Sequence, residues 1–188
     1  MKTVLHMLAT LTVIGVISGG ALSFVNGWAV PHIAENQRRD TERAIYLVQP
    51  SAKSYESVAG AGCELYRVFD GAQQPIGFAM AYAGNGFQGK IRLMAGVSPD
   101  ASTVIALEIL EQVETPGLGT KVVEDPFRTQ FTNLVAQPDV VAVKGAEPSA
   151  PNEIQTITGA TISSKAVVRI VNDALATLRA AIKEGKVK

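Results

Sequence analysis

The chain opens on a long uncharged stretch, and polar residues alternate with apolar ones only after it. Residues 3–34 contain no Lys, Arg, Asp or Glu, and residues 4–25 are rich in Val, Leu and Ile. A helix over residues 4–25 is roughly 33 Å long, enough to cross the hydrocarbon core of a bilayer. A cleaved signal peptide is the alternative, but its apolar region is usually shorter. We therefore predict a retained transmembrane anchor over residues 1–33.

The pattern changes after Pro31, where charged and apolar residues mix at helical spacing. Residues 34–50 are predicted to form a juxtamembrane helix that continues outward and is ended by Pro50. Residues 51–62, rich in Ser and Gly, are expected to form a loop. β-Branched or alternating segments then predict an antiparallel sheet, with strands at residues 63–69, 75–83, 90–97 and 103–112.

Helical signals return in the second half of the chain. Asp125 and Pro126 suit the N-cap and first position of a short helix reaching about residue 134. A short strand over 140–144, a loop over 145–152 and a final amphipathic helix over 162–183 follow. The expected fold class is α+β: one N-terminal transmembrane helix followed by a twisted antiparallel sheet with flanking helices. The domain itself is expected to cover residues 51–188.

Composition restricts the chemistry of this domain. The 17 basic residues balance the 17 acidic ones, which argues against nucleic acid as a partner. Cys63 is the single cysteine, and both histidines, His6 and His32, precede the domain. Histidine-dependent nucleophilic catalysis and the usual zinc sites are therefore excluded there. We predict no catalytic side chain and no metal site, so any reactivity is expected to come from a cofactor.

Two short motifs are candidates for holding such a cofactor. The first precedes the final helix and is followed by two serines; its residues are Thr158, Gly159, Ala160, Thr161, Ser163 and Ser164. Free N–H groups at a helix start favour an anion, although Thr161 as N-cap with Ser164 at the third position is an equally simple interpretation. The second motif follows the last long strand and contains Glu114, Thr115, Gly117, Leu118 and Gly119. An ordinary strand-to-helix loop is its alternative interpretation.

Together the two motifs closely resemble the FMN-binding domain of the Rnf and Na⁺-translocating NADH:quinone reductase complexes. The apolar anchor, the chain length and the run at residues 86–100 are most similar to the G-subunit family of Rnf complexes. The resemblance implies one FMN per chain, esterified through its phosphate to Thr161 by a separate flavin transferase. It also implies that Ser163 and Ser164 donate to the phosphate, while Leu118, Glu114 and Thr115 border the isoalloxazine.

The same resemblance implies a role and a location. The chain is expected to pass electrons within a ferredoxin:NAD⁺ oxidoreductase that translocates ions, beside other Rnf subunits, and not to be catalytic alone. A single-pass protein of the cytoplasmic membrane is expected, with its FMN domain on the extracytoplasmic side. The charges flanking the span do not decide this orientation, since long domains translocate largely regardless of charge.

Two positions depart from the family pattern. Gln155 stands where an acidic residue commonly precedes the first motif, and Gln112 stands where a histidine often precedes the second. Two alternatives also remain at this stage. One is the C subunit of the Na⁺-translocating quinone reductase, and the other is a flavin-free assembly subunit of a membrane complex.

Overall fold

The computed structural model describes residues 2–187 in two parts. The first part is the helix α1 (Lys2–Val48) as far as Asp40, and from Thr41 onward the chain forms one compact unit. A single helix thus covers the two helical segments expected on either side of residue 33. It continues through Pro31 and ends at Val48, two residues before Pro50, because the residue before a proline disfavours helical geometry.

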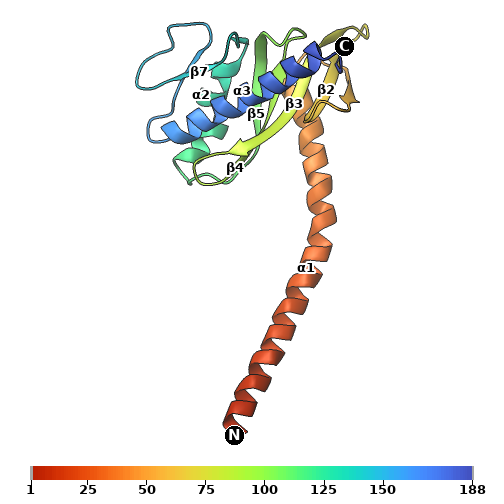
Figure 1. The fold of residues 1–188 in the computed structure, drawn as a ribbon, viewed down its shortest axis with the longest axis vertical. Helices are drawn as coiled ribbons and strands as arrows, with labels where there is room; N and C mark the ends of the chain where they lie inside the picture. The colour runs from red at the N-terminus through yellow and green to blue at the C-terminus, as the bar shows by residue number, and fades with distance from the viewer. Residues whose placement is uncertain (1, 188) are drawn as a thin grey trace. The chain divides into compact units, whose positions relative to one another are not determined.

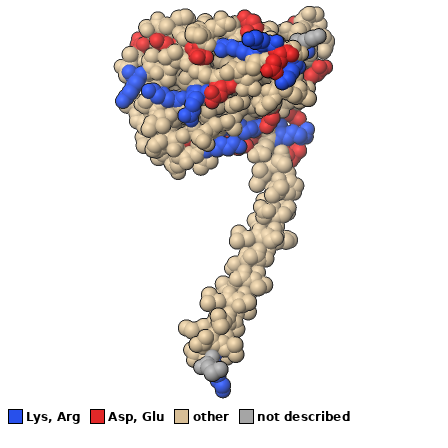
Figure 2. All heavy atoms as spheres, in the orientation of Figure 1, with Lys and Arg blue, Asp and Glu red and all other residues tan. Residues whose placement is uncertain are grey.

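α1 is the one helix among the described residues that is long and apolar enough to cross a membrane. Its apolar side chains before residue 34 are largely exposed, as at Leu11 and Phe24, which are 68% and 78% exposed. Figure 2 shows that charged side chains gather on the compact unit and on the neighbouring turns of α1, while most of α1 is uncharged. The predicted apolar helix is therefore present, and its side chains have no protein core to enter.

The compact unit is built on a six-stranded antiparallel sheet whose spatial order follows the chain (Figure 1). Its strands are β1 (Ser54–Val58), β2 (Glu64–Phe69), β3 (Pro75–Asn85), β4 (Lys90–Val97), β5 (Thr103–Gln112) and β6 (Leu134–Val135). The alternating segments thus formed the expected strands, two of them with the expected bounds. The α+β fold predicted from the sequence is confirmed.

Three strands were not predicted from the sequence: the edge strand β1 and the short strands β6 and β8 (Glu153–Gln155). Residues 51–62 were expected to be a loop, but Ser54–Val58 pairs with β2 along its whole length. The strand carries Ser54, Glu56 and Ser57, so it lacks the apolar alternation that marks a buried strand. An edge strand needs little apolar surface, because its outer edge pairs with no further strand of the sheet and faces solvent.

Each face of the sheet has its own apolar core. On one face, residues such as Met80, Leu93 and Val97 pack with α3 (Thr161–Lys183), which crosses the sheet in Figure 1. On the other face, Ala79, Ala81 and Met94 pack with the last turns of α1. Because neighbouring residues of β3 and β4 point to opposite faces, both strands are apolar almost throughout.

The segment between β5 and β6 differs from the predicted helix. It forms η1 (Gly119–Val123), a single turn α2 (Asp125–Arg128) and η2 (Thr129–Phe131). Asp125 is the first helical residue rather than the N-cap, which is Glu124, and its carboxylate pairs with Arg128 at 2.5 Å. The helical turns end at Phe131, since Thr132 is already extended, Asn133 takes a left-handed φ of 53° and Leu134 joins the sheet.

The rest of the second half largely follows the prediction. β7 (Val141–Val143) lies within the strand expected at 140–144, and a loop follows it. A short strand that was not predicted, β8 (Glu153–Gln155), pairs with β7 in parallel. The turn after β8 carries the first motif directly to the start of α3, where the candidate site lies.

Candidate functional site

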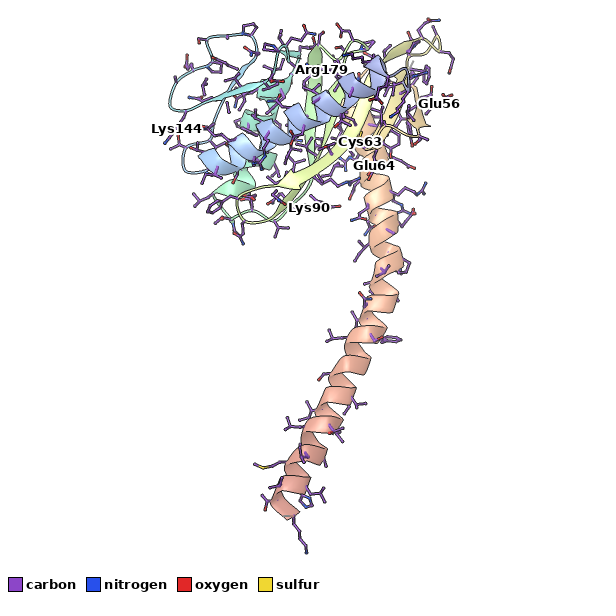
Figure 3. The ribbon with its side chains drawn as sticks, in the orientation of Figure 1. Glu56, Cys63, Glu64, Lys90, Lys144 and Arg179 are labelled. Atoms are coloured by element: carbon purple, nitrogen blue, oxygen red, sulfur yellow. The ribbon has the colours of Figure 1, made fainter. Side chains whose placement is uncertain are left out.

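Three segments far apart in the sequence meet at one end of the sheet. They are the β3–β4 loop at residues 86–89, the second motif at 114–119 and the first motif at 158–164. β3, β4 and β5 are neighbours, and the pairs Asn85↔Lys90 and Ile91↔Gln112 bring the loop and the second motif together. Lys90 is labelled at this end of the sheet in Figure 3. The two motifs that were singled out separately therefore belong to one site.

Glu114 lies at the centre of this arrangement. Its side chain is only 4% exposed. One carboxylate oxygen, Oε1, accepts hydrogen bonds from the N–H groups of Phe87 at 2.9 Å, Gln88 at 3.1 Å and Gly89 at 3.5 Å. The other, Oε2, accepts a hydrogen bond from the Ser163 hydroxyl at 2.5 Å. We call these five residues the Glu114 network.

The network determines the charge state of Glu114. Burial raises the pKa of the Glu114 carboxyl, but the hydrogen bonds from Ser163 and from the loop N–H groups together hold this pKa below its ordinary value. The group is therefore a carboxylate at neutral pH. Ser163 is the third residue of α3, so the negative charge also lies at the positive end of that helix.

Two glycines give the carboxylate its space. A Cβ at Gly86 would lie 2.1 Å from Oε1 of Glu114, and one at Gly119 would lie 2.8 Å from both Oε2 and the Ser163 Oγ. Real Cβ atoms essentially never approach other atoms this closely, so any other residue would displace the carboxylate. Gly119 of the second motif is thus required by packing, because its own φ is not positive.

The serines that follow Thr161 already have protein partners. Ser163 donates to Glu114, and Ser164 donates to the Ala160 carbonyl at 2.9 Å while accepting from the Ile157 N–H at 3.0 Å. Both serines are buried, at 3% and 0% exposure. Donation to a phosphate, as the sequence analysis expected, would require either hydroxyl to give up its present acceptor.

Thr161 is placed differently from the serines. The interpretation of Thr161 as N-cap is wrong: the N-cap is Ala160, Thr161 is the first helical residue, and no side chain caps the helix. Ser164 is accordingly the fourth helical residue, one position later than that interpretation required. The Thr161 side chain is half-buried, and among residues 2–187 its hydroxyl has no hydrogen-bond partner. The Thr161 hydroxyl is therefore available at the start of α3, which has no side-chain cap.

The turn before Thr161 is shaped by Gly159 and contacts the second motif. Gly159 has a φ of +83°, a left-handed conformation that other residues rarely adopt. A Cβ on it would be 3.4 Å from Leu118 Cδ2, so the Leu118 side chain lies against this turn. Thr158 is exposed and Ala160 is buried. This contact brings the tip of the second motif next to the first.

The second motif is held as a tight turn by its own hydrogen bonds. The N–H groups of Leu118 and Thr120 both donate to the Thr115 carbonyl at 3.2 Å, and the Gly117 N–H donates to the Thr120 hydroxyl at 3.0 Å. The Thr115 hydroxyl donates to the Gln88 side chain at 3.0 Å. Thr115 therefore makes a second link, besides Glu114, between this motif and the β3–β4 loop.

Apolar side chains are exposed around the site. They are Phe87 at 62%, Val113 at 62%, Leu118 at 49% and Ile162 at 59% exposure. An open cavity of about 240 Å³ lies on the Thr158 side, lined by Lys121, Gln130, Gln155 and Thr158 among others. The site thus offers apolar surface beside polar groups, a combination typical of sites for flat, partly polar ligands.

The sequence analysis missed part of this site. None of the candidate residues came from the 86–89 loop. Gly86 and Gly89, three positions apart, could have indicated it, because glycine is typical of a backbone that other groups approach closely. Gln112, noted as a departure from the family pattern, accepts a hydrogen bond from the Glu114 N–H at 2.7 Å. Gln155 is held by Gln130, whose side-chain oxygen accepts from the Gln155 N–H at 2.6 Å. Gln112 and Gln155, the two residues that depart from the family pattern, therefore both take part in hydrogen bonds around the site.

Comparison with known proteins assigns a family to this arrangement. A model of the FMN-binding domain matches residues 86–176, a range that begins at the β3–β4 loop and includes both motifs. The G subunit of the Na⁺-translocating ferredoxin:NAD⁺ oxidoreductase complex of Acetobacterium woodii is 30% identical, over 91% of this chain and 89% of that protein. The G subunit of the proton-translocating complex of Clostridium ljungdahlii is 32% identical, over 88% and 86% of the two chains.

Solved structures agree at the level of fold. The C subunit of the Na⁺-translocating NADH-quinone reductase from Parabacteroides distasonis aligns with a TM-score of 0.59 at 19% identity, over 77% of this chain and 94% of that one. The corresponding protein of Shewanella oneidensis gives a TM-score of 0.58. The motifs, the fold and the full-length relatives agree, and the chain belongs to the G-subunit family of the Rnf-type ion-translocating oxidoreductase complexes, with an FMN-binding domain.

Proposed function

We propose that this chain is the electron-carrying G subunit of a ferredoxin:NAD⁺ oxidoreductase complex, and that one FMN is attached through its phosphate to Thr161. The observation that carries the proposal is the free Thr161 hydroxyl at the start of α3. Of the hydroxyls at residues 161–164, it is the one without a protein partner in the part of the chain described. Esterification of Thr161 would therefore break no hydrogen bond of the fold.

The start of α3 fits a phosphate ester. The first helical N–H groups have no acceptor within a helix, and α3 has no side-chain cap. The first backbone bond of this turn runs from the Ser164 N–H to the Ala160 carbonyl at 2.9 Å. The N–H groups of Thr161 and Ile162 therefore remain to stabilise the single negative charge of a phosphodiester, with the helix dipole.

The surrounding side chains fit the flavin ring. Leu118 and Ile162 are exposed apolar residues on either side of the turn, and Thr115 and Gly117 fix the loop that carries Leu118. We assign Thr158, Gly159 and Ala160 to the turn that orients the ester, and Leu118 to contact with the ring. Lys165, one turn after Thr161 and exposed, adds a positive charge on the same face of α3.

When bound, FMN supplies the electron-transfer chemistry, which no side chain of this domain provides. The chain's own residues hold the phosphate at a fixed point and limit the positions of the ring. The relatives from Acetobacterium and Clostridium belong to ferredoxin:NAD⁺ oxidoreductase complexes. We assign this chain the same assembly, with maturation by a flavin transferase. The coupling ion is Na⁺ in one of these relatives and H⁺ in the other.

Covalent flavin is tested by expressing the full chain together with a flavin transferase. The wild-type band should fluoresce under ultraviolet light after denaturing electrophoresis. Thr161→Val should give a dark band, because valine keeps the branched shape of threonine but has no hydroxyl to esterify. Intact mass and peptide mapping of residues 153–169 locate the modification.

Thr132→Val is the matched control, since it removes an exposed hydroxyl from a residue outside both motifs. It should leave the fluorescent band, and both variants should unfold at the temperature of the wild type. A fluorescent Thr161→Val band would place the attachment elsewhere. A dark wild-type band from cells containing an active transferase would favour the flavin-free assembly subunit instead.

We also propose that residues 1–33 anchor the chain as a single span of the cytoplasmic membrane, that residues 34–50 form the helix leading out of it, and that residues 51–188 carry the FMN on the extracytoplasmic side. Protease added to intact spheroplasts tests the orientation. The domain should be degraded while a cytoplasmic marker protein stays intact. Protection of the domain until the membrane is broken would reverse the orientation.

The C subunit of the Na⁺-translocating quinone reductase is the weaker candidate. This chain covers only 59% of the length of such subunits from Vibrio anguillarum and Vibrio alginolyticus, against 89% of the Acetobacterium G subunit. The agreement with solved C subunits is one of fold. The G subunits therefore match this chain over a larger share of both proteins.

A further inference from the structure

We propose that Glu114 is a positioning residue, whose buried carboxylate fixes the Thr161 turn to the β3–β4 loop without touching the flavin. The proposal rests on attachment at Thr161 and refines the expectation that Glu114 is a polar contact of the ring. Its consequence is that the geometry of the flavin site depends on an internal anion, which joins three segments of the chain.

Both carboxylate oxygens of Glu114 already have donors within the protein. Its two oxygens accept four hydrogen bonds, three from consecutive backbone N–H groups at residues 87–89 and one from Ser163. With 4% of its surface exposed, the side chain also presents almost nothing to a ligand. A direct contact with the ring would require the carboxylate to leave these donors.

The surroundings of Glu114 are shaped for its carboxylate. Gly86 and Gly119 leave room for one oxygen each, and a Cβ at either position would collide with Glu114. The Gln112 side chain accepts from the Glu114 N–H and so fixes the backbone from which the carboxylate projects. The position of Glu114 is therefore determined from several sides by protein atoms.

The negative charge of Glu114 strengthens the network. No Lys, Arg or His forms an ion pair with Glu114 in the part of the chain that the structure describes. Its charge is balanced by N–H and O–H dipoles, including those at the start of α3. Hydrogen bonds to an ionised acceptor are about twice as strong as neutral ones. Loss of the charge should therefore loosen both ends of the network, the 87–89 loop and the turn at Ser163.

The Glu114 network is linked to Thr161 on both sides of that residue. Ser163 is two residues after Thr161 on the first turn of α3, and Leu118, four residues after Glu114, touches Gly159 on the other side of Thr161. Both flanks of the attachment residue are thus held by the segment that carries Glu114. Without the network, the Thr161 hydroxyl keeps its chemistry but loses its fixed position.

The test uses the full chain with Glu114→Ala, Glu114→Gln and Ser163→Ala, each also made in a Thr161→Val background that carries no flavin. Glu111→Gln is the matched control: it removes a glutamate from the same segment, whose ion pair is with Arg92 at 3.8 Å. Hydrogen exchange of the flavin-free proteins is measured by mass spectrometry for peptides covering 86–90 and 158–164.

Exchange in both peptides should be at least tenfold faster in Glu114→Ala than in the control. Glu114→Gln should restore only part of the protection, because its amide oxygen still accepts from the loop and its NH₂ group can donate to Ser163, but these neutral hydrogen bonds are weaker. Ser163→Ala should affect mainly the 158–164 peptide. Unchanged exchange at 86–90 in Glu114→Ala would overturn the proposal, whether or not the wild type carries flavin.

The flavin-loaded proteins give the second readout. The loaded fraction should fall severalfold in Glu114→Ala, and iodide should quench the remaining flavin more strongly, since the ring is held less firmly. Glu114→Gln should lie between Glu114→Ala and the wild type in both respects, and it should keep the wild-type flavin absorption spectrum. Equal spectral shifts in Glu114→Ala and Glu114→Gln would show direct contact with the ring and would also overturn the proposal.

Discussion

At the scale of single residues, the domain repeatedly uses one carboxylate to organise one loop. Asp100 accepts from the hydroxyls of Ser98 and Ser102 and from the Ser102 N–H in the β4–β5 turn. Glu153 accepts from the hydroxyl and N–H of Ser149 and from the Ala150 N–H. Glu114 uses the same principle but is buried, and it joins segments that are distant in the sequence. The candidate site therefore uses, between distant segments, the same kind of carboxylate hydrogen bonding that elsewhere stabilises ordinary turns.

Asp100 gives a prediction at this scale. The hydrogen bonds from Ser98 and Ser102 lower the pKa of Asp100 to about 2, from an ordinary value of 3.8. A group with a lowered pKa stabilises the fold above its unfolded pKa, and this contribution disappears as the pH falls toward its folded pKa. The free energy of unfolding of the wild type should therefore decrease between about pH 4 and pH 2 by more than that of Asp100→Asn.

Asp100→Asn should also cost about 1 kcal/mol at neutral pH, because asparagine accepts these hydrogen bonds less strongly. Urea unfolding at several pH values measures both effects. Asp173→Asn is the control, since Asp173 is an exposed residue of α3 whose loss should change neither quantity. Identical pH profiles for the wild type and Asp100→Asn would refute the assignment.

At the scale of elements, periodic sequence patterns predicted the strands and the helix that pack into the apolar cores. β4 and β5 have the bounds expected from the sequence, and α3 begins one residue early. These segments carry apolar residues at the spacing of their own structure, so their pattern is local. β1 was missed because an edge strand needs no such pattern, and β8 because three residues contain too little of one.

The candidate site could be predicted only in part, for a related reason. The motifs identified Thr161, Gly159 and Leu118 because a few adjacent residues carry the resemblance. The Glu114 network joins residues that are 27 and 49 positions apart, so no local pattern contains it. The same distance explains why Ser163 was expected to face the phosphate, because its partner Glu114 is 49 positions away in the sequence. The partners of Ser164, Ala160 and Ile157, lie within the same turn.

At the scale of the whole molecule, one helix belongs to two environments. The part of α1 before residue 41 is exposed and mostly apolar, whereas Ala44, Ile45 and Val48 are at most 1% exposed within the compact unit. Gln49, directly after the helix, donates to the carbonyls of Phe78 and Val97. The contact is close, since a Cβ on Gly96 would lie 2.0 Å from the Val48 carbonyl oxygen. The last turns of α1 are therefore part of the domain's second core.

This division predicts different behaviour for two truncated chains. A fragment of residues 41–188 retains the last turns of α1 and should unfold cooperatively as a monomer. A fragment of residues 50–188 uncovers Ala79, Ala81 and Met94 on the sheet and loses the burial of Ile45 and Val48. Burial of such side chains contributes about 1.5–3 kcal/mol each, so the combined loss approaches the total stability of many domains.

Calorimetry and size-exclusion chromatography of the two fragments measure this difference, and Ile45→Ala in the 41–188 fragment separates the effect of packing from that of chain length. Ile45→Ala should cost about 2–5 kcal/mol, because a fully buried side chain leaves a cavity. Tyr46→Ala is the control, since Tyr46 is a neighbouring residue of the same turn that is 44% exposed. If residues 50–188 unfold at the same temperature as residues 41–188, the end of α1 serves as a connection alone, and the domain begins after Pro50.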